Sequence, residues 1–180
     1  MKTAKYFVLI SAACSIAACG VPKTYFTNNI RQAMERDKVP LTKIQFYNDK
    51  EVVLGREMDE GEAIVKGGSI TFVNGVKKEL IVLKAHTPGI CTQTGDNTLT
   101  VSFDMGDGRE LHFGKPANST DNTPYTIFAD KWVKNYGEIT YDGKRFYIQP
   151  GSADARLMIQ RNVVNKEERK QSVMKGRKVE

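Results

Sequence analysis

Beyond residue 41, hydrophobic and polar residues alternate along most of the chain with a period of two, as in β-strands that bury one face. Three pairs of alternating segments flank turns in which glycine stands beside asparagine or aspartate, and such turns are strong hairpin signals. We therefore expect three antiparallel hairpins, with turns at Asn74-Gly75, Gly106-Asp107-Gly108 and Asp142-Gly143.

Further strands are predicted outside these hairpins. A strand through Ile44 and Phe46 reaches a turn at Asn48-Asp49, after which Val52 begins a return strand. Residues 157–159 supply a last strand. Pro88-Gly89 predicts a turn between two strands, because proline followed by glycine suits the central positions of a tight turn.

One segment has the period of a helix. Its apolar residues are spaced so that they share one stripe of a helix, and Thr27 or Asn28 can cap the first turn. Pro40 cannot continue a helix, so we expect one over 27–37. The residues of the stripe are Phe26, Ile30, Ala33 and Met34.

Residues 115–124 are polar, contain no period and predict an exposed loop. The aromatic segment that follows fits either a strand or a short helix at 130–135. About nine short strands with one leading helix indicate a mainly β fold, either an antiparallel β-sandwich or a small β-barrel with one short N-terminal helix.

The chain begins with the three parts of a secretory signal peptide. Lys2 and Lys5 precede an uncharged stretch over 6–18 that ends in small residues before Cys19. The stretch is shorter than the roughly 20 apolar residues that a helix needs to cross a bilayer. The sequence therefore predicts export of the chain rather than a permanent membrane span.

The segment Ile16-Ala17-Ala18-Cys19 resembles the lipobox of bacterial lipoproteins. The resemblance implies cleavage between Ala18 and Cys19, a diacylglyceryl group on the Cys19 thiol, and acylation such as palmitate on the new amino terminus. Two or three acyl chains make membrane anchoring stable. The alternative is an ordinary secreted protein, cleaved after Ala18 or near Ala13.

Gly20 stands where an aspartate would mark retention in the inner membrane, and no acidic run follows Cys19. We therefore expect an outer-membrane, lipid-anchored protein that faces the periplasm. In general layout, the mature domain is similar to small all-β lipoproteins that are common in the Bacteroidota.

These features divide the chain into four parts. Residues 1–18 are the signal peptide, 19–25 a lipid-anchored tether, 26–162 a single β-rich domain and 163–180 a basic C-terminal tail. The formal charge of +6 falls to +4 when Lys2 and Lys5 leave with the signal. Acidic and basic residues are mixed through the domain, so nucleic acid is not an expected partner.

Little in the sequence suggests catalysis. Of the three cysteines, Cys14 leaves with the signal and Cys19 carries lipid, so Cys91 is the one remaining thiol. His86 lies five residues before it, and a histidine close to a cysteine can activate the thiol as a nucleophile. A turn beside an inert thiol explains the same residues. We expect no catalytic residue, no metal site and no cofactor.

The richest recognition feature is a group of aromatic residues between 125 and 147, because tyrosine and tryptophan favour binding surfaces. Trp132, Tyr136 and Tyr125 are the candidate binding aromatics. The first hypothesis is a non-catalytic binding or assembly protein that acts on other envelope proteins. The alternatives are a lipocalin-like protein that binds a small apolar ligand and a cysteine-dependent hydrolase.

Overall fold

The computed structural model describes residues 21–168, which fold into two antiparallel β-sheets and a few short helices. The prediction of a mainly β fold is confirmed, and the strands form two sheets rather than a closed barrel. The signal peptide, the lipobox and Cys19 lie outside the described residues, as does the tail from residue 169 onward. No helix between residues 21 and 168 is long and apolar enough to cross a membrane.

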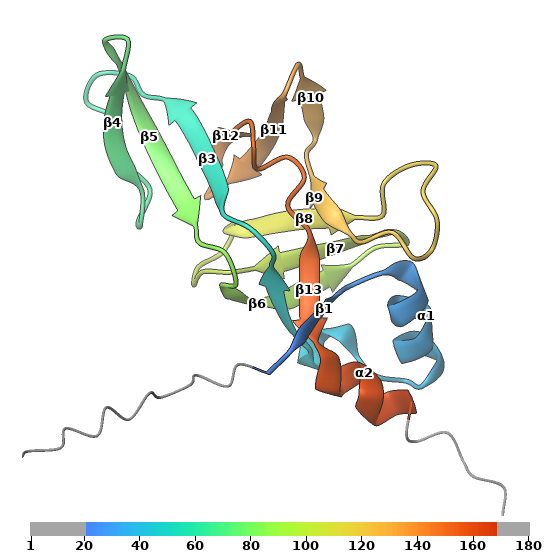
Figure 1. Ribbon diagram of the computed structural model, residues 1–180. Coiled ribbons are helices and arrows are strands. Elements are labelled where there is room, and N and C mark those ends of the chain that lie inside the picture. The colour runs from blue at the N-terminus through green and yellow to red at the C-terminus, as the bar shows by residue number, and fades with distance from the viewer. Residues whose placement is uncertain (1–20, 169–180) are drawn as a thin grey trace, which may run out of the picture.

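The seven-stranded sheet curls, so that its two ends meet (Figure 1). At the meeting point, the Tyr125 amide donates a 2.9 Å hydrogen bond to the Phe26 carbonyl, and the Leu157 amide donates one of 2.9 Å to the Tyr125 carbonyl. An isolated bridge joins Thr126 to Arg156 nearby. In spatial order the strands are β1 (Lys23–Tyr25), β13 (Leu157–Gln160), β2 (Gln45–Asn48), β6 (Pro88–Thr94), β7 (Thr98–Ser102), β8 (Glu110–Gly114) and β9 (Thr126–Phe128).

The six-stranded sheet stays open at both ends. One end is a hairpin of β4 and β5 that projects from the domain at the upper left of Figure 1. The other end is β10, which pairs only with β11. In spatial order the strands are β10 (Lys131–Val133), β11 (Tyr136–Tyr141), β12 (Lys144–Ile148), β3 (Val52–Glu57), β5 (Val76–Leu83) and β4 (Ser69–Val73).

The predicted N-terminal helix is confirmed as α1 (Asn28–Arg36). Thr27 caps it, because its side-chain oxygen accepts a 3.4 Å hydrogen bond from the amide of Ile30. A 3-10 turn, η1 (Leu41–Lys43), leads into β2. A second helix, α2 (Arg161–Glu168), follows β13 and contains the start of the segment expected as a basic tail. The segment expected as a tether ends in β1, which pairs with β13.

The three predicted hairpins are confirmed as β4–β5, β7–β8 and β11–β12. The strand predicted to begin at Val52 is present as β3, but its predicted return along β2 is wrong, because β2 and β3 belong to different sheets. Asn48 is fully buried where the chain crosses between them, and its side-chain amide donates to the carbonyls of Lys50 and Lys84 at 2.6 and 2.7 Å.

The turn predicted at Pro88-Gly89 is also wrong, since β6 begins there. The chain reverses earlier, near His86, whose φ is 63°. A Cβ atom on Gly89 would lie 2.6 Å from a ring carbon of Phe103, so this glycine permits a close packing contact. For residues 130–135, the structure has a strand, β10, rather than a short helix.

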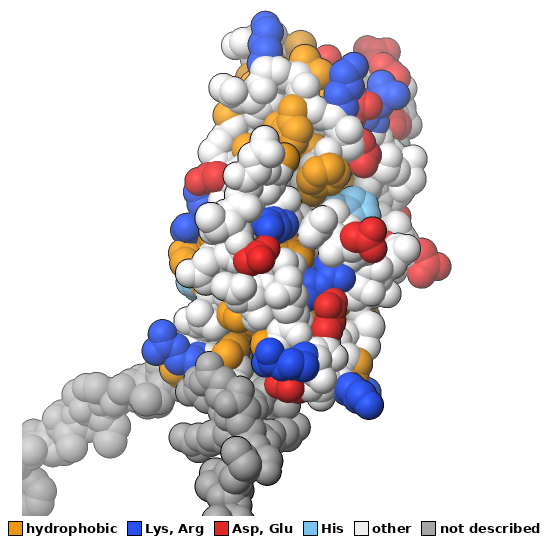
Figure 2. Space-filling model, turned by 90° about the vertical axis from the view of Figure 1, so that its right-hand side faces the viewer, with side chains coloured by type: hydrophobic (Ala, Val, Ile, Leu, Met, Phe, Trp, Pro, Cys, Tyr) orange, Lys and Arg blue, Asp and Glu red, His pale blue; other side chains and the backbone are white. Residues whose placement is uncertain are grey.

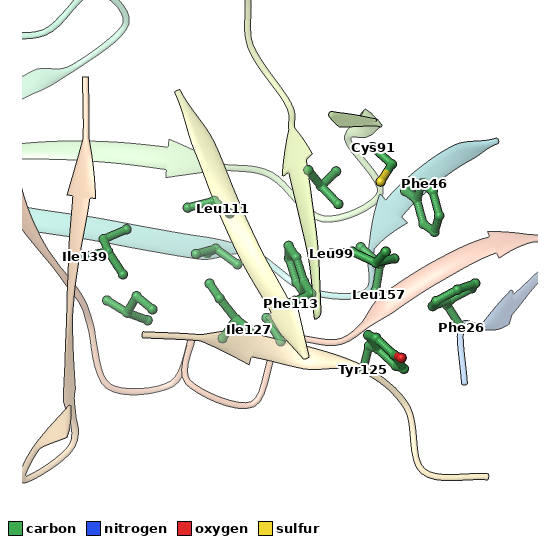
Figure 3. Close-up of a cluster of buried hydrophobic side chains, with 14 of the residues drawn as sticks. Phe26, Phe46, Cys91, Leu99, Leu111, Phe113, Tyr125, Ile127, Ile139 and Leu157 are labelled. Carbon is green, nitrogen blue, oxygen red and sulfur yellow. The ribbon is translucent and has the colours of Figure 1, made fainter. Parts of the chain in front are cut away.

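The core is one cluster of buried side chains from both sheets (Figure 3). At one side of the cluster, Phe26 packs edge to face against Phe46 and Tyr125, with ring centroids 5.2 and 5.1 Å apart (Figure 3). Phe113 and Leu157 are also fully buried. Burial of these large apolar side chains is the main force that holds the domain together.

A buried ion pair lies within the six-stranded sheet. Arg56 Nε donates a 2.7 Å hydrogen bond to Glu79, whose side chain has no exposed surface. The other Glu79 oxygen accepts from the amide of Val65, and Arg56 also reaches Glu62 at 2.6 Å. These contacts hold the connection between β3 and β4 against the sheet.

Candidate functional site

The three candidate aromatics do not form one surface. Tyr125 is fully buried, with its ring in the core. Its hydroxyl accepts from Arg31 Nη1 at 3.4 Å and donates to Asn28 Oδ1 at 3.3 Å. The prediction that Tyr125 is a binding aromatic is therefore wrong: α1 supplies partners for its polar atom, which allows the ring to be buried.

Trp132 and Tyr136 are exposed, by 41% and 42%, in the β10–β11 hairpin. Trp132 is opposite Gly137 in the register, whereas Tyr136 is opposite Val133. Because neighbouring residues of a strand point to opposite faces, Trp132 and Tyr136 lie on opposite sides of the hairpin. Hydrophobic side chains are visible on the upper half of the face that Figure 2 shows, where β9 and β10 lie.

Trp132 lines a hollow of about 330 Å³ between the β10–β11 turn and the β12–β13 connection. We call it the Trp132 hollow. A methyl group on Gly137 would lie 3.0 Å from two ring carbons of Trp132, so the ring lies directly over this glycine. The residues that line the hollow are Trp132, Lys134, Asn135, Pro150, Gly151, Ala153 and Asp154.

The wall formed by the β12–β13 connection is held by hydrogen bonds. Lys50 Nζ donates to both carboxylate oxygens of Asp154, at 2.7 and 2.6 Å. The side-chain oxygen of Ser152 accepts from the amide of Val53 at 3.0 Å. The hydrogen bond from Lys50 lowers the pKa of Asp154, which keeps this carboxylate charged. One wall of the hollow is therefore tied to Lys50 and Val53, and it carries a carboxylate whose charge is paired with Lys50.

A second exposed feature is the free side of β4, which we call the β4 edge. The strand carries no charge, and Ile70 and Phe72 are 47% and 69% exposed. Val73 of β4 and Val76 of β5 flank a two-residue turn and are opposite each other in the register. The backbones of these two residues therefore hydrogen-bond to each other. By alternation, the amides and carbonyls of Ile70 and Phe72 point away from β5, towards the free edge.

The other sheet ends are better protected. Lysine is a common guard of edge strands, and β10 has Lys131 while β1 has Lys23. The outer side of β9 is covered, because an isolated bridge joins Thr126 to Arg156, the residue before β13. Among the sheet ends within residues 21–168, β4 combines greater length, absence of charge and exposed apolar side chains.

The sequence pattern did not identify the β4 edge. Ile70 and Phe72 alternate with polar residues as core positions do, and they lie on the face that carries buried Glu79 in the neighbouring strand. Their exposure follows from the position of β4 at the end of the sheet, where no layer covers them. The uncharged run of the strand was the available signal.

His86 and Cys91 do not form a nucleophile and its base. Cys91 is 3% exposed, and burial raises the pKa of its thiol. Its sulfur donates to the carbonyl of Gln93 at 3.3 Å, whereas His86 is exposed in the preceding turn. A thiol with a raised pKa and no access to solvent is a poor nucleophile.

Within residues 21–168, no three histidine, cysteine or acidic side chains are grouped so that they could hold a metal ion. Comparison with protein-family models, with curated proteins and with solved structures finds no match to this chain. The two surface features, the β4 edge and the Trp132 hollow, therefore carry the functional argument on their own geometry.

Proposed function

We propose that this protein is a lipoprotein of the bacterial outer membrane, anchored through lipid on Cys19 and facing the periplasm. Its β domain binds other envelope proteins and performs no catalysis. The proposal combines the lipobox over 16–19 with a surface that is suited to association.

The position of the anchor favours a particular orientation. Val21, the first described residue, follows Cys19 by two residues, which span at most about 7 Å of extended chain. The strand β1 begins at Lys23, so the domain would lie close to the membrane. The β4–β5 hairpin lies at the opposite end of the domain from β1 in Figure 1. It would thus be presented to partners away from the bilayer.

The single observation that carries the binding role is the β4 edge. Its free amides and carbonyls at Ile70 and Phe72 can pair with an extended segment of another protein, which adds a strand to the sheet. The exposed side chains of the same two residues would pack beside the added strand. A monomeric protein normally guards such an edge, because it promotes association.

The two alternatives have less support. A lipocalin-like protein needs a closed barrel with room for an apolar ligand, whereas the strands form two sheets and large side chains such as Phe46 and Phe113 fill the core. A cysteine-dependent hydrolase needs an accessible thiolate, whereas Cys91 is buried. Binding to other envelope proteins remains the better-supported function.

The anchor is tested by labelling cells with palmitate. The full chain should carry label and sediment with the membranes, and the Cys19→Ser chain should lose the label and become soluble. Equal labelling of the two chains would contradict lipidation of Cys19.

The binding role is tested by recovering the anchored full chain from cross-linked envelopes. A protein that co-purifies with the natural chain should be lost when Ile70 and Phe72 are both replaced by lysine. Val82→Lys is the matched control, because Val82 is 45% exposed in β5 but pairs with Val53 of β3 and lies beyond the residues that pair with β4. Recovery of monomer alone from the natural chain, or equal loss with Val82→Lys, would refute the role of the edge.

A further inference from the structure

The side chains around the Trp132 hollow suggest what kind of ligand it accepts. Trp132 supplies one flat apolar surface, and Lys134, Asn135 and Asp154 supply an amine, an amide and a carboxylate. The two charged residues of the lining have opposite sign, and the Asp154 charge is also paired with Lys50, so the hollow presents no cluster of like charges. A matching ligand is itself neutral, has one apolar face and carries several hydroxyl or amide groups around it.

We propose that the Trp132 hollow binds a neutral saccharide. The axial C–H groups of a pyranose ring form a flat apolar face that can stack on the indole ring, which buries apolar area on both sides. The hydroxyl groups at the rim of the sugar then donate to Asp154, accept from Lys134, and both donate to and accept from the amide of Asn135. Charged partners make such bonds stronger than bonds between neutral groups.

Other ligand classes fit less well. An apolar ligand would cover the polar groups of Lys134 and Asn135 without offering them hydrogen bonds, which is costly. A multiply charged ligand would meet a repelling charge, since the hollow contains one group of each sign. An extended peptide gains most from a long, uncharged strand edge, and β4 with five residues supplies this better than β10 with three residues and Lys131.

The size and support of the hollow agree with a small ligand. Its volume of about 330 Å³ is at the lower end of the range for ligand sites, which suits one or two sugar rings. Trp132 is held over Gly137, and Asp154 is held by Lys50. Side chains that are already in position lose less conformational freedom on binding.

The chain contains one tryptophan, so its fluorescence reports on the Trp132 hollow directly. The full chain, purified in detergent, is titrated with neutral trisaccharides of glucose, mannose, galactose and N-acetylglucosamine. At least one should produce a saturable change in Trp132 emission. Sorbitol has hydroxyl groups but no ring face and should produce none. If none of the four sugars gives a saturable change, the proposal is overturned.

Variants separate a sugar site from a nonspecific effect. By calorimetry, Trp132→Ala should abolish binding, and Asn135→Ala and Asp154→Asn should each weaken it about tenfold, as loss of one hydrogen bond predicts. Tyr136→Ala is the matched control, because Tyr136 is equally exposed on the opposite side of the hairpin, and it should bind within twofold of the natural chain. Equal loss with Tyr136→Ala would overturn the proposal.

The saccharide site does not depend on the role of the β4 edge. Replacement of Ile70 and Phe72 by lysine should leave sugar binding unchanged, and Trp132→Ala should leave protein recovery from envelopes unchanged. The two proposals can therefore fail independently, and these variants show which of the two has failed.

Discussion

The two sheets differ in how much of their surface is buried when the domain folds. The seven-stranded sheet curls until Tyr125 hydrogen-bonds to Phe26 and Leu157, and Phe113 is fully buried inside it. The six-stranded sheet remains open at both ends, where Phe72 and Trp132 are 69% and 41% exposed. Phe113 in the first sheet stabilises the fold by its burial, whereas Phe72 and Trp132, near the ends of the second sheet, remain in contact with solvent.

The contrast shows that residue type alone does not decide the role of an aromatic side chain. A phenylalanine in β8 and a phenylalanine in β4 both occupy alternating positions of a strand. One has a second layer of structure above it, and the other does not. Substitutions that compare equivalent residues of the two sheets therefore test the division between stability and binding.

The largest expected effect is at Phe113. Phe113→Ala removes a fully buried ring that packs against Phe103, and it should lower the free energy of unfolding by about 3–5 kcal/mol. Phe72→Ala removes the same side chain from an exposed position and should change it by less than about 0.5 kcal/mol. Urea unfolding of both variants measures the difference, and similar losses would remove the contrast between the sheets.

The next effect is at the buried ion pair in the six-stranded sheet. Glu79→Gln leaves the buried Arg56 charge with Glu62 as its remaining acidic partner. The substitution should lower the free energy of unfolding by about 3 kcal/mol. Glu62→Gln is the control, because this partner is partly exposed and its loss should cost much less stability than the loss of Glu79. Glu79→Gln should also speed protease cleavage between 58 and 68. Equal stability of the two variants would show that the pair does not anchor this connection.

A smaller effect is expected at Gly137. A methyl group there would lie 2.7 Å from the Ala129 side chain and 3.0 Å from the Trp132 ring. Gly137→Ala should therefore displace Trp132 and cost about 1–3 kcal/mol, as overpacking does. A shift in the emission of Trp132 measures the displacement. Unchanged emission would mean that the glycine does not position the ring, and Tyr136→Ala provides the control.

The smallest effect on stability is expected at Asp154, which pairs with Lys50 at the surface. Asp154→Asn should cost no more than about 0.5 kcal/mol. The Lys50 hydrogen bond lowers the pKa of Asp154, so the contribution of the pair is complete above the ordinary aspartate pKa of about 3.9. It is lost as the pH falls through the lowered value. Melting temperatures of both chains should therefore converge in acid, and a constant difference would contradict this assignment.

Prediction from the sequence succeeded where local chemistry decides the structure. The Asn74-Gly75 turn has φ of 52° and 78°, which few other residue pairs adopt at low cost, and the hairpin follows from it. The turn at Pro88-Gly89 failed because Gly89 serves a contact with Phe103 that is distant along the chain. The strand from Val52 is present as β3, but its predicted pairing with β2 failed, because the partner of a strand depends on which sheet it joins.

The candidate site was predicted only in part. Trp132 and Tyr136 were expected as exposed aromatics and both lie at the surface, but their placement on opposite faces depends on the register of β10 with β11. Tyr125 was expected at the surface and is buried, because Arg31 and Asn28 in α1 reach its hydroxyl. The wall that contains Asp154 was not expected, since it lies in a connection between strands.

The sequence by itself determined the mainly β class, the α1 helix and the three hairpins, because period, caps and turn residues act over a few neighbouring positions. Tertiary structure alone decided which strands share a sheet, which end of a sheet stays open and which aromatic side chains reach solvent. These outcomes depend on contacts between residues that are far apart in the chain. The local pattern of hydrophobic and polar residues does not show which distant segments will pack over a strand.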